Sequence, residues 1–367
     1  MHTNLMEIDS NSGAHMSVSG RDILNFTGCC YLGICAEPSI VRAGTQALER
    51  YGSLGQIPRH YGSLPKPYMD VEEAAADYFK SESSMFFAAG YLFASMALQG
   101  LLDQYDVLFL DEKAHYSIRD GAAATHKPTV WFSHANAEDL EEQMKLNLKP
   151  GQRPMIATDG MFPTYGDVPP LDKYMRLVEK YDGWMVIDES HSLGVFGQHG
   201  RGVVEKFGLT RERVISGGSM AKAFCAYGAV AMGSSACIKA IWQSPPARGA
   251  AGGMTAAAAM SAASLRYVAQ HPELLQNLRH SIAFIKSRMN AMGIPVGDTE
   301  SPNVTFSIGT AKDMLNIQQS MFQNNIYMMY SNYVGAAAEG VLRCSLFADH
   351  TEDDIERFLD TLKRYLP

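Results

Sequence analysis

The chain has 367 residues, of which 46% are hydrophobic and 19% are charged, and its formal net charge is -8. This composition excludes disorder as the general state, and the negative charge offers no basic field for binding nucleic acid. A chain of this length predicts one large domain and one smaller domain.

The sequence also contains no segment that predicts a membrane or secreted protein. No run approaches the roughly 18 apolar residues that span a bilayer, and the first twenty residues lack the apolar core of a signal peptide. The six cysteines show no closely spaced pair of the zinc-binding or redox kind. We therefore expect no metal site, no transmembrane segment and reduced thiols in a cytoplasmic protein.

In chain order, the N-terminal part predicts few regular elements. Residues 1–20 are polar and predict a loosely packed arm, which leads into a short strand over 23–26. A helix follows Pro38, and the glycines and prolines of residues 51–67 predict a loop that could line a site.

From Asp70 to Ser216, predicted helices and strands alternate. This alternation indicates an α/β fold with a mostly parallel sheet covered by helices on both faces. The expected strands cover residues 85–87, 107–110, 129–132, 155–158, 184–187 and 213–216.

Beyond Ser234 the pattern changes towards a second domain. A small-residue helix over 250–263 and a long amphipathic helix over 272–292 lead to two further strands and two helices, and the last helix carries Thr351 as its N-cap. We expect an N-terminal segment over 1–40, a large domain over 41–270 and a small C-terminal domain over 271–367.

Two chemical groups stand at strand ends in the large domain. Asp188 directly follows the apolar run from Trp184, and Lys222 follows a small-residue turn after the next strand. Ligands bind at the carboxyl ends of strands in parallel sheets. One carboxylate and one amine suit pyridoxal 5'-phosphate, whose aldehyde forms a Schiff base with lysine and whose ring nitrogen keeps its proton beside an anion. Either residue alone is more simply an exposed strand end.

A phosphate site is the third component that such a cofactor requires. Ala89, Gly90 and Tyr91 follow a short strand at a predicted helix start, where backbone N–H groups can bind phosphate, and Ser219 adds a hydroxyl near Lys222. Small residues begin many helices, so this pattern alone is equally compatible with a simple helix start.

Three further polar residues have both a functional and a structural interpretation. His115, after the strand over 107–110, could lie flat on the cofactor ring, and His191 could contact the ring hydroxyl, but both could be ordinary loop histidines. Arg343 lies in an otherwise apolar strand and needs an anion, which could be a substrate carboxylate or an internal carboxylate partner.

Taken together, these residues and their spacing resemble the α-oxoamine synthases, the fold-type I pyridoxal-phosphate enzymes that include 8-amino-7-oxononanoate synthase, 2-amino-3-ketobutyrate CoA ligase and serine palmitoyltransferase. The similarity runs from about Leu24 to the C-terminus, and residues 58–62 and 197–205 resemble serine palmitoyltransferase subunits in particular. The pieces that carry it are Asn25-Phe26, Tyr31-Leu32-Gly33, Ala89-Gly90-Tyr91, Asp111 with His115 and Ser117, Gly166-Asp167, Asp188 to His191, Ser219 with Lys222-Ala223-Phe224, and Leu342-Arg343.

The resemblance implies a fold-type I architecture and a decarboxylative Claisen condensation between a small amino acid (glycine, alanine or serine) and an acyl thioester, carried by coenzyme A or a carrier protein. It implies that Lys222 holds the cofactor and removes the α-proton of the amino acid, and that Asp188 stabilises the pyridinium. His115 would stack on the ring, His191 would contact its hydroxyl, and Arg343 would hold the carboxylate. Active sites of this family form between two subunits, so a homodimer is implied.

Several positions differ from the family pattern, and they concern the substrates more than the cofactor. Cys29 stands where the family has an asparagine near the carboxylate, and Tyr68 replaces a second histidine. The serine before the lysine is Ala221, a glutamate and a serine near the ring become Asp159 and Pro163, and Thr255 is the threonine nearest to the phosphate-binding pair that the partner subunit lends.

These differences keep two alternatives open. One is another enzyme of the same fold, an aminotransferase or an amino-acid decarboxylase. The other is a non-catalytic partner subunit, against which the presence of Lys222 argues.

Overall fold

The structure is a computed structural model, and it describes residues 6–53, 61–250 and 252–366. Part of the expected loop over 51–67, including the first three residues of the 58–62 stretch, lies outside these residues. Ala251, in the region expected to contribute to phosphate binding, also lies outside them.

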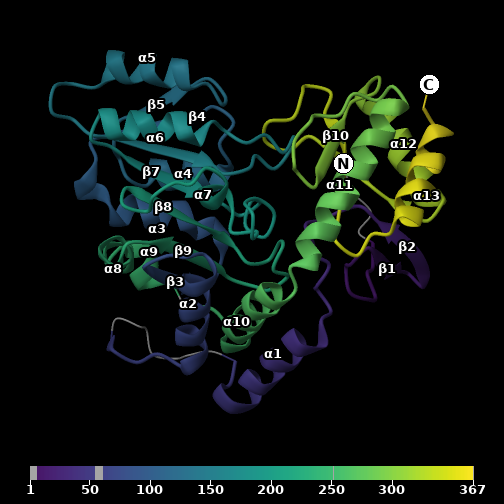
Figure 1. Cartoon of the computed structure of the whole chain (residues 1–367), viewed down its shortest axis with the longest axis horizontal. Coiled ribbons are helices and arrows are strands. Elements are labelled where there is room, and N and C mark those ends of the chain that lie inside the picture. Colours follow the sequence, from purple (N-terminus) through teal and green to yellow (C-terminus); the bar gives the residue numbers. More distant parts are fainter. Residues whose placement is uncertain (1–5, 54–60, 251, 367) are drawn as a thin grey trace.

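A seven-stranded sheet forms the centre of the larger part of the molecule (Figure 1). Four neighbouring strand pairs, from β8 to β5, are parallel, and β9 is antiparallel to both of its neighbours. This confirms the expected mostly parallel sheet. In sheet order the strands are β3 (Ser83–Phe87), β9 (Ala229–Gly233), β8 (Val214–Ser219), β7 (Trp184–Asp188), β6 (Pro154–Asp159), β4 (Val107–Asp111) and β5 (Thr129–Phe132).

Helices cover both faces of this sheet because each central strand is apolar on both sides. In β4, Phe109 belongs to one buried cluster, whereas its neighbours Leu108 and Leu110 belong to the other. Such continuous burial is typical of parallel strands between two helical layers. The helices of this part are α2 (Lys66–Tyr78), α3 (Phe93–Gly100), α4 (Tyr116–Ala123), α5 (Ala137–Asn147), α6 (Leu171–Lys180), α7 (Val203–Lys206), α8 (Ser235–Trp242) and α9 (Pro245–Gly249), with short 3-10 turns at Gly90–Leu92 and Leu102–Gln104.

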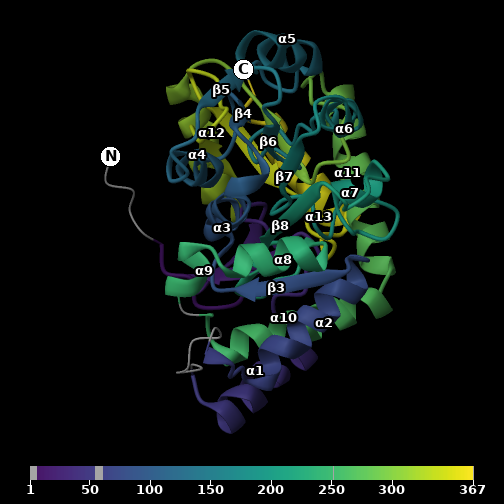
Figure 2. The same ribbon diagram turned by 90° about the vertical axis from the view of Figure 1, so that its left-hand side faces the viewer.

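At one end of the molecule, α1 (Pro38–Tyr51) packs on α10 (Thr255–Gln270), which in turn packs on α2 (Figure 2). The close approach of α1 to α10 requires a glycine, since a Cβ on Gly44 would lie 2.8 Å from the Met260 side chain. α2 begins at Lys66, inside the segment that the sequence predicts to be a loop, and its buried face includes Tyr68 and Val71.

The C-terminal elements form a smaller unit that α11 (Glu273–Ala291) joins to the rest (Figure 1). Three antiparallel strands, β10 (Asn303–Phe306), β13 (Val341–Ser345) and β12 (Met329–Ser331), form its sheet. The remaining helices are α12 (Ala311–Gln323) and α13 (Glu352–Lys363). Thr351 caps α13 in a capping box with Asp354, and Ile355, Phe358, Leu359 and Leu362 form its buried stripe, as the sequence predicts.

The N-terminal segment is more ordered than the sequence predicts. Within the expected arm, β1 (His15–Val18) pairs with β2 (Arg21–Asn25), and β2 pairs in parallel with β11 (Ile326–Tyr327). The expectation of a loosely packed arm is therefore wrong for residues 15–18. The apolar side chains of Met16 and Val18 explain this, because they are buried with Ile23.

Across the described residues, no helix combines the length and the hydropathy that a membrane crossing requires.

Candidate functional site

A cavity of about 160 Å³ opens at the carboxyl ends of β6, β7 and β8. It collects side chains from segments between residues 90 and 222, which lie close together only because parallel strands end at the same edge of the sheet. Its walls are formed by Gly90, Tyr91, His115, Ser117, Asp159, Asp188, Ser190, His191, Ser219 and Lys222.

Asp188 is the buried anion of this cavity. It is the last residue of β7 and is only 5% exposed. Its Oδ1 accepts a hydrogen bond from the Ser190 amide at 2.9 Å, which fixes the plane of the carboxylate. Among the described residues, none donates to Oδ2. That oxygen is therefore available to a ligand.

Lys222 faces the same cavity from the turn after β8. Burial lowers the pKa of its amine, an effect that Asp188 partly opposes. No hydrogen bond or ion pair joins its Nζ to any residue that the structure describes. A half-buried amine without a partner and with a lowered pKa is suited to bonding an aldehyde.

Gly90 and Ser219 line the cavity together. A Cβ on Gly90 would lie 2.8 Å from the Ser219 Cβ and 3.1 Å from the Ser219 amide, so only glycine allows this approach. The backbone N–H groups of Gly90 and Tyr91 open a helical turn, and none of the described residues accepts from them. The Ser219 hydroxyl accepts from the Ala221 amide at 3.1 Å. Together these groups can bind a phosphate.

His115 is held by a hydrogen bond at each ring nitrogen. Its Nδ1 lies 2.7 Å from the Ser117 hydroxyl, and its Nε2 lies 2.7 Å from the Tyr333 hydroxyl. Burial lowers the pKa of the imidazole, which keeps it neutral at pH 7. Tyr333 follows β12, so this contact joins the C-terminal unit to the large sheet.

Asp159 places a second carboxyl group beside Asp188. The two residues are cross-strand neighbours on β6 and β7, and Asp159 Oδ2 accepts from the His115 amide at 2.9 Å. Burial, and then the nearby charge of Asp188, raise the pKa of Asp159 well above its usual range. Both effects favour the protonated form of Asp159.

His191 begins a chain of hydrogen bonds that leads out of the cavity. Its Nδ1 lies 2.9 Å from the Tyr31 hydroxyl, and Tyr31 donates to Asn303 Oδ1 at 3.3 Å. Asn303 Nδ2 donates to the Pro163 carbonyl at 3.0 Å, so its oxygen must face Tyr31 and Arg343. Burial lowers the pKa of His191 well below its usual value, and Lys222 and Arg343 lower it further.

Arg343 is a buried cation at the end of this chain. Its guanidinium Nη2 donates to Asn303 Oδ1 at 3.0 Å, to Ser345 at 3.3 Å and to the Cys29 sulfur at 3.7 Å. Its Nε has no partner among the described residues, and none of the ion pairs found there includes it. The internal carboxylate partner that the sequence left open is thus not found in the described part of the chain. A buried guanidinium of this kind is suited to an anionic ligand.

The structure does not bring every predicted site residue to the cavity wall. Cys29 is next to Arg343, and Tyr68 packs on Phe86 and donates from its hydroxyl to the Gly253 carbonyl. Ala89 precedes the turn at Gly90 and contributes no side chain to the cavity. Thr255 is fully buried at the start of α10, and its hydroxyl donates to the Gly52 carbonyl. The roles predicted for these residues stay predictions.

Sequence reasoning missed three residues of the site. Tyr333 and Asn303 show no local pattern, since each contacts a residue that lies far away in the chain. Tyr31 was recognised only as part of a motif, and its contact with His191 spans 160 positions. A tyrosine in an apolar segment gives no signal of which distant imidazole it contacts.

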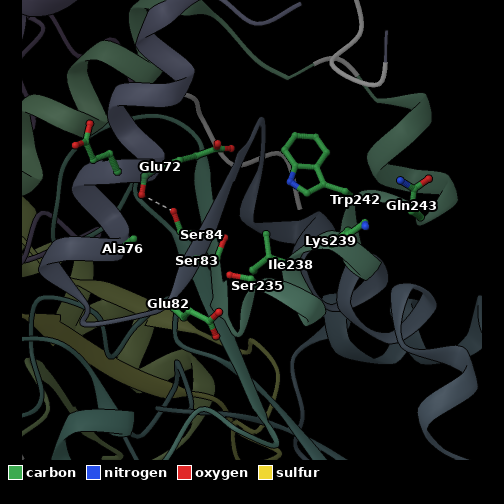
Figure 3. A pocket seen from close by; sticks show the side chains of 11 residues that line it. Glu72, Ala76, Glu82, Ser83, Ser84, Ser235, Ile238, Lys239, Trp242 and Gln243 are labelled. Atoms are coloured by element: carbon green, nitrogen blue, oxygen red, sulfur yellow. Dashed lines mark hydrogen bonds between the residues drawn. The ribbon is translucent and has the colours of Figure 1, made fainter. Parts of the chain in front are cut away.

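A larger hollow of about 550 Å³ lies beside β3, between α2 and α8 (Figure 3). Glu72, Glu82 and Lys239 reach it together with Trp242 and several serines. Two of its polar side chains form hydrogen bonds with the backbone. The Ser84 hydroxyl donates to the Glu72 carbonyl, and the Phe86 amide donates to the Glu72 carboxylate. The amine of Lys222 and the carboxylate of Asp188, which line the smaller cavity without described partners at Nζ and Oδ2, make that cavity the better candidate.

Comparisons with known proteins match almost the whole chain. The family model described as aminotransferase class I and II matches residues 41–362. A serine palmitoyltransferase of Bacteroides ovatus is 28% identical over 97% of this chain and 91% of its own length. An 8-amino-7-oxononanoate synthase of Coprothermobacter proteolyticus is 26% identical over 97% of this chain and 91% of its own length.

Solved structures show the same fold. A serine palmitoyltransferase from S. paucimobilis, solved with a bound PLP–myriocin aldimine, superposes with a TM-score of 0.92 at 23% identity. The superposition covers 98% of this chain and 92% of the other.

Proposed function

Because the chain belongs to the aminotransferase class I and II family, we propose that it joins a small amino acid to an acyl thioester, with loss of carbon dioxide, on pyridoxal 5'-phosphate held between Asp188 and Lys222. The observation that carries this proposal is that the two groups, which come from different strands, face one cavity that is also lined by the turn at Gly90 and by Ser219.

The relatives support the same reaction class. The resemblance to α-oxoamine synthases agrees with relatives named serine palmitoyltransferase and 8-amino-7-oxononanoate synthase, and the fold-type I architecture agrees with the solved neighbours. The chain is a pyridoxal-phosphate-dependent acyltransferase of this group.

The cavity fits the cofactor at three points. Gly90 leaves the space that a Cβ would fill, and the free N–H groups of Gly90 and Tyr91 face a place for a phosphate. Asp188 Oδ2 is free for a pyridinium proton, and Lys222 Nζ is free for an aldehyde. When bound, the cofactor supplies that aldehyde and a ring that accepts electrons from the amino acid.

Lys222 would transfer the α-proton, and Asp188 would hold the proton of the ring nitrogen. Because burial lowers the pKa of Lys222, its amine gives up a proton more readily than an exposed lysine does, and it can then take the α-proton of the substrate. Asp188, fixed by Ser190, would keep a proton on the ring nitrogen.

The two histidines would act as neutral groups. Tyr31 donates its single proton to Asn303, so it accepts from His191 Nδ1, and His191 Nε2 remains as an acceptor for the ring hydroxyl. His115, held by Ser117 and Tyr333, would cover the ring. Asp159 would supply a proton near the acyl oxygen.

Arg343 would bind the carboxylate of the amino acid. The buried guanidinium has neutral partners at Nη2 and no described partner at Nε. A substrate carboxylate would neutralise it, and loss of carbon dioxide would then remove the anion that holds the substrate.

We further propose a homodimer in the cytoplasm, with active sites shared between the two subunits. Coenzyme A and a carrier protein are both suitable acyl carriers. Because Cys29 and Tyr68 differ from the family pattern, glycine, alanine and serine are all candidate amino acids.

The test starts from purified protein loaded with pyridoxal phosphate. Borohydride reduction should attach the cofactor to Lys222, as located by peptide mass spectrometry, and a Lys222→Ala variant should stay unlabelled. Glycine, alanine or serine with an acyl-CoA should then release free thiol and carbon dioxide. Turnover of an amino acid with a 2-oxo acid, without thiol release, would favour an aminotransferase. Carbon dioxide release without a thioester would favour a decarboxylase.

A further inference from the structure

We propose that Cys30 and Cys225 form a two-electron oxidation site beside the cofactor cavity, where a peroxide converts the two thiols to a disulfide that alters the Lys222 turn. This inference is independent of the substrate, since it concerns two thiols that the proposed reaction does not use.

The two sulfur atoms are already in contact, with 3.3 Å between Cys30 Sγ and Cys225 Sγ. A disulfide needs about 2.05 Å, so the pair must close by only about 1.2 Å. Both residues are half-buried, which leaves them accessible to a small oxidant. Cys35 also interacts with the Cys30 thiol, so Cys30 has two candidate disulfide partners, Cys225 and Cys35.

Cys225 is bound directly to the turn that carries Lys222. Its thiol donates to the Lys222 carbonyl at 3.3 Å, and its amide donates to the same carbonyl at 3.0 Å. Its φ angle of 50° lies in the left-handed region, which a cysteine occupies only when the surrounding contacts hold it there. Oxidation removes the thiol proton and draws the sulfur away, so the turn loses one of these two hydrogen bonds.

Cys30 lies between two residues that reach the other side of the site. Cys29 contacts the Arg343 guanidinium, and Tyr31 contacts His191 Nδ1. A bond from Cys30 to Cys225 would therefore tie the segment over 29–31 to the Lys222 turn, across 195 positions of the chain.

The reaction balances with a peroxide as the oxidant. A thiolate of the pair attacks a peroxide oxygen to give a sulfenic acid and water, and the second thiol displaces a second water as the S–S bond forms. Two thiols are oxidised and one peroxide is reduced to two waters. A thiol reductant reverses the change by exchange. The hydrogen bond that the Cys30 thiol donates to Cys225, together with burial, raises the pKa of Cys30, so oxidation should be slower than in a dedicated peroxide sensor.

The experiment treats the full-length protein with hydrogen peroxide and maps disulfides in unreduced peptides by mass spectrometry. We expect a Cys30–Cys225 crosslink, the loss of two of the six thiols, and a higher melting temperature that returns to its starting value with dithiothreitol. The oxidised protein should also take up pyridoxal phosphate more slowly, on the order of tenfold, because the Lys222 turn is displaced.

Three matched variants complete the test. Cys30→Ser and Cys225→Ser should show neither the crosslink nor the slower uptake, whereas Cys237→Ser, a buried cysteine of α8 away from the pair, should behave like the parent protein. A Cys30–Cys35 crosslink in place of Cys30–Cys225 would overturn the proposal. Full retention of both thiols under peroxide, or a crosslink that leaves cofactor uptake unchanged, would overturn it as well. Each of these results is independent of whether the acyltransferase activity is found.

Discussion

Replacement of Arg343 by methionine separates the two roles that a buried cation can have. A structural arginine stabilises the fold through its partners, whereas a binding arginine costs stability until its ligand arrives. The Arg343 Nη2 has only neutral partners, and its Nε has none among the described residues. The structure therefore predicts that Arg343→Met weakens substrate binding without a comparable loss of stability.

The magnitudes follow from these contacts. Asn303 Oδ1 still accepts from Ser345 at 3.1 Å and from Tyr31 at 3.3 Å in the variant, so no buried acceptor is left unpaired. The variant loses the hydrogen bonds of Arg343, which lowers the free energy of unfolding, and it removes a buried charge, which raises it. Because these two effects oppose each other, we expect the free energy of unfolding to change by less than about 2 kcal/mol. Loss of a buried charge pair with a carboxylate costs about 2–5 kcal/mol, so amino-acid affinity should fall at least about 30-fold.

The assay is a spectral titration of the cofactor-loaded protein with serine and with ethanolamine, alongside thermal unfolding. Serine carries a carboxylate and ethanolamine does not, so the variant should lose affinity for serine alone. Arg279→Met is the matched control, because Arg279 donates to the Gly197 and Val195 carbonyls away from the site. Unchanged serine affinity in Arg343→Met, or equal losses for both ligands, would refute the assignment.

Three further substitutions test other parts of the structure. Gly90→Ala should weaken pyridoxal phosphate binding in a fluorescence titration, because the new Cβ meets Ser219 at 2.8 Å. Tyr333→Phe should lower kcat/KM for the acyl thioester about 2- to 12-fold, since it removes one hydrogen bond from His115 Nε2, and it should leave cofactor binding unchanged. For His134, burial alone would lower the pKa, but hydrogen bonds to Asp111 and Asp167 raise it to about 9. Its stabilising effect is therefore complete below pH 6.5 and lost as the pH rises through 9, and His134→Asn should flatten the fall of the melting temperature over that interval.

The parts of the fold that could be predicted are those with a local cause. Thr351 and the apolar stripe behind it predict α13, and the apolar run that ends in Asp188 predicts β7. The sequence does not predict β9, because Ala229–Gly233 consists mostly of small residues and Val230 is its only β-branched or aromatic side chain. It is buried through pairing with β3 and β8.

The residues of the candidate site also divide into those that the sequence predicts and those that it does not. Residues at strand ends, such as Asp188 and Lys222, could be placed together because the topology of a parallel sheet brings strand ends to one edge. Contacts that the N-terminal segment and the C-terminal unit make with the site could not be predicted. No local pattern specifies that Tyr31 contacts His191 or that Tyr333 contacts His115. Such contacts depend on how separate elements pack.

The contacts that the sequence does not predict connect the cavity to Arg343, where we propose that the substrate carboxylate binds. Arg343 and Tyr31 both donate to Asn303 Oδ1, and Tyr31 also bonds to His191 Nδ1. A carboxylate that draws the guanidinium towards itself would weaken its hold on Asn303 and leave Tyr31 as a stronger donor to that oxygen. This arrangement would favour the His191 tautomer with its proton on Nδ1, so that Nε2 accepts from the ring hydroxyl. Binding of the amino acid would thus favour the His191 tautomer that the reaction requires.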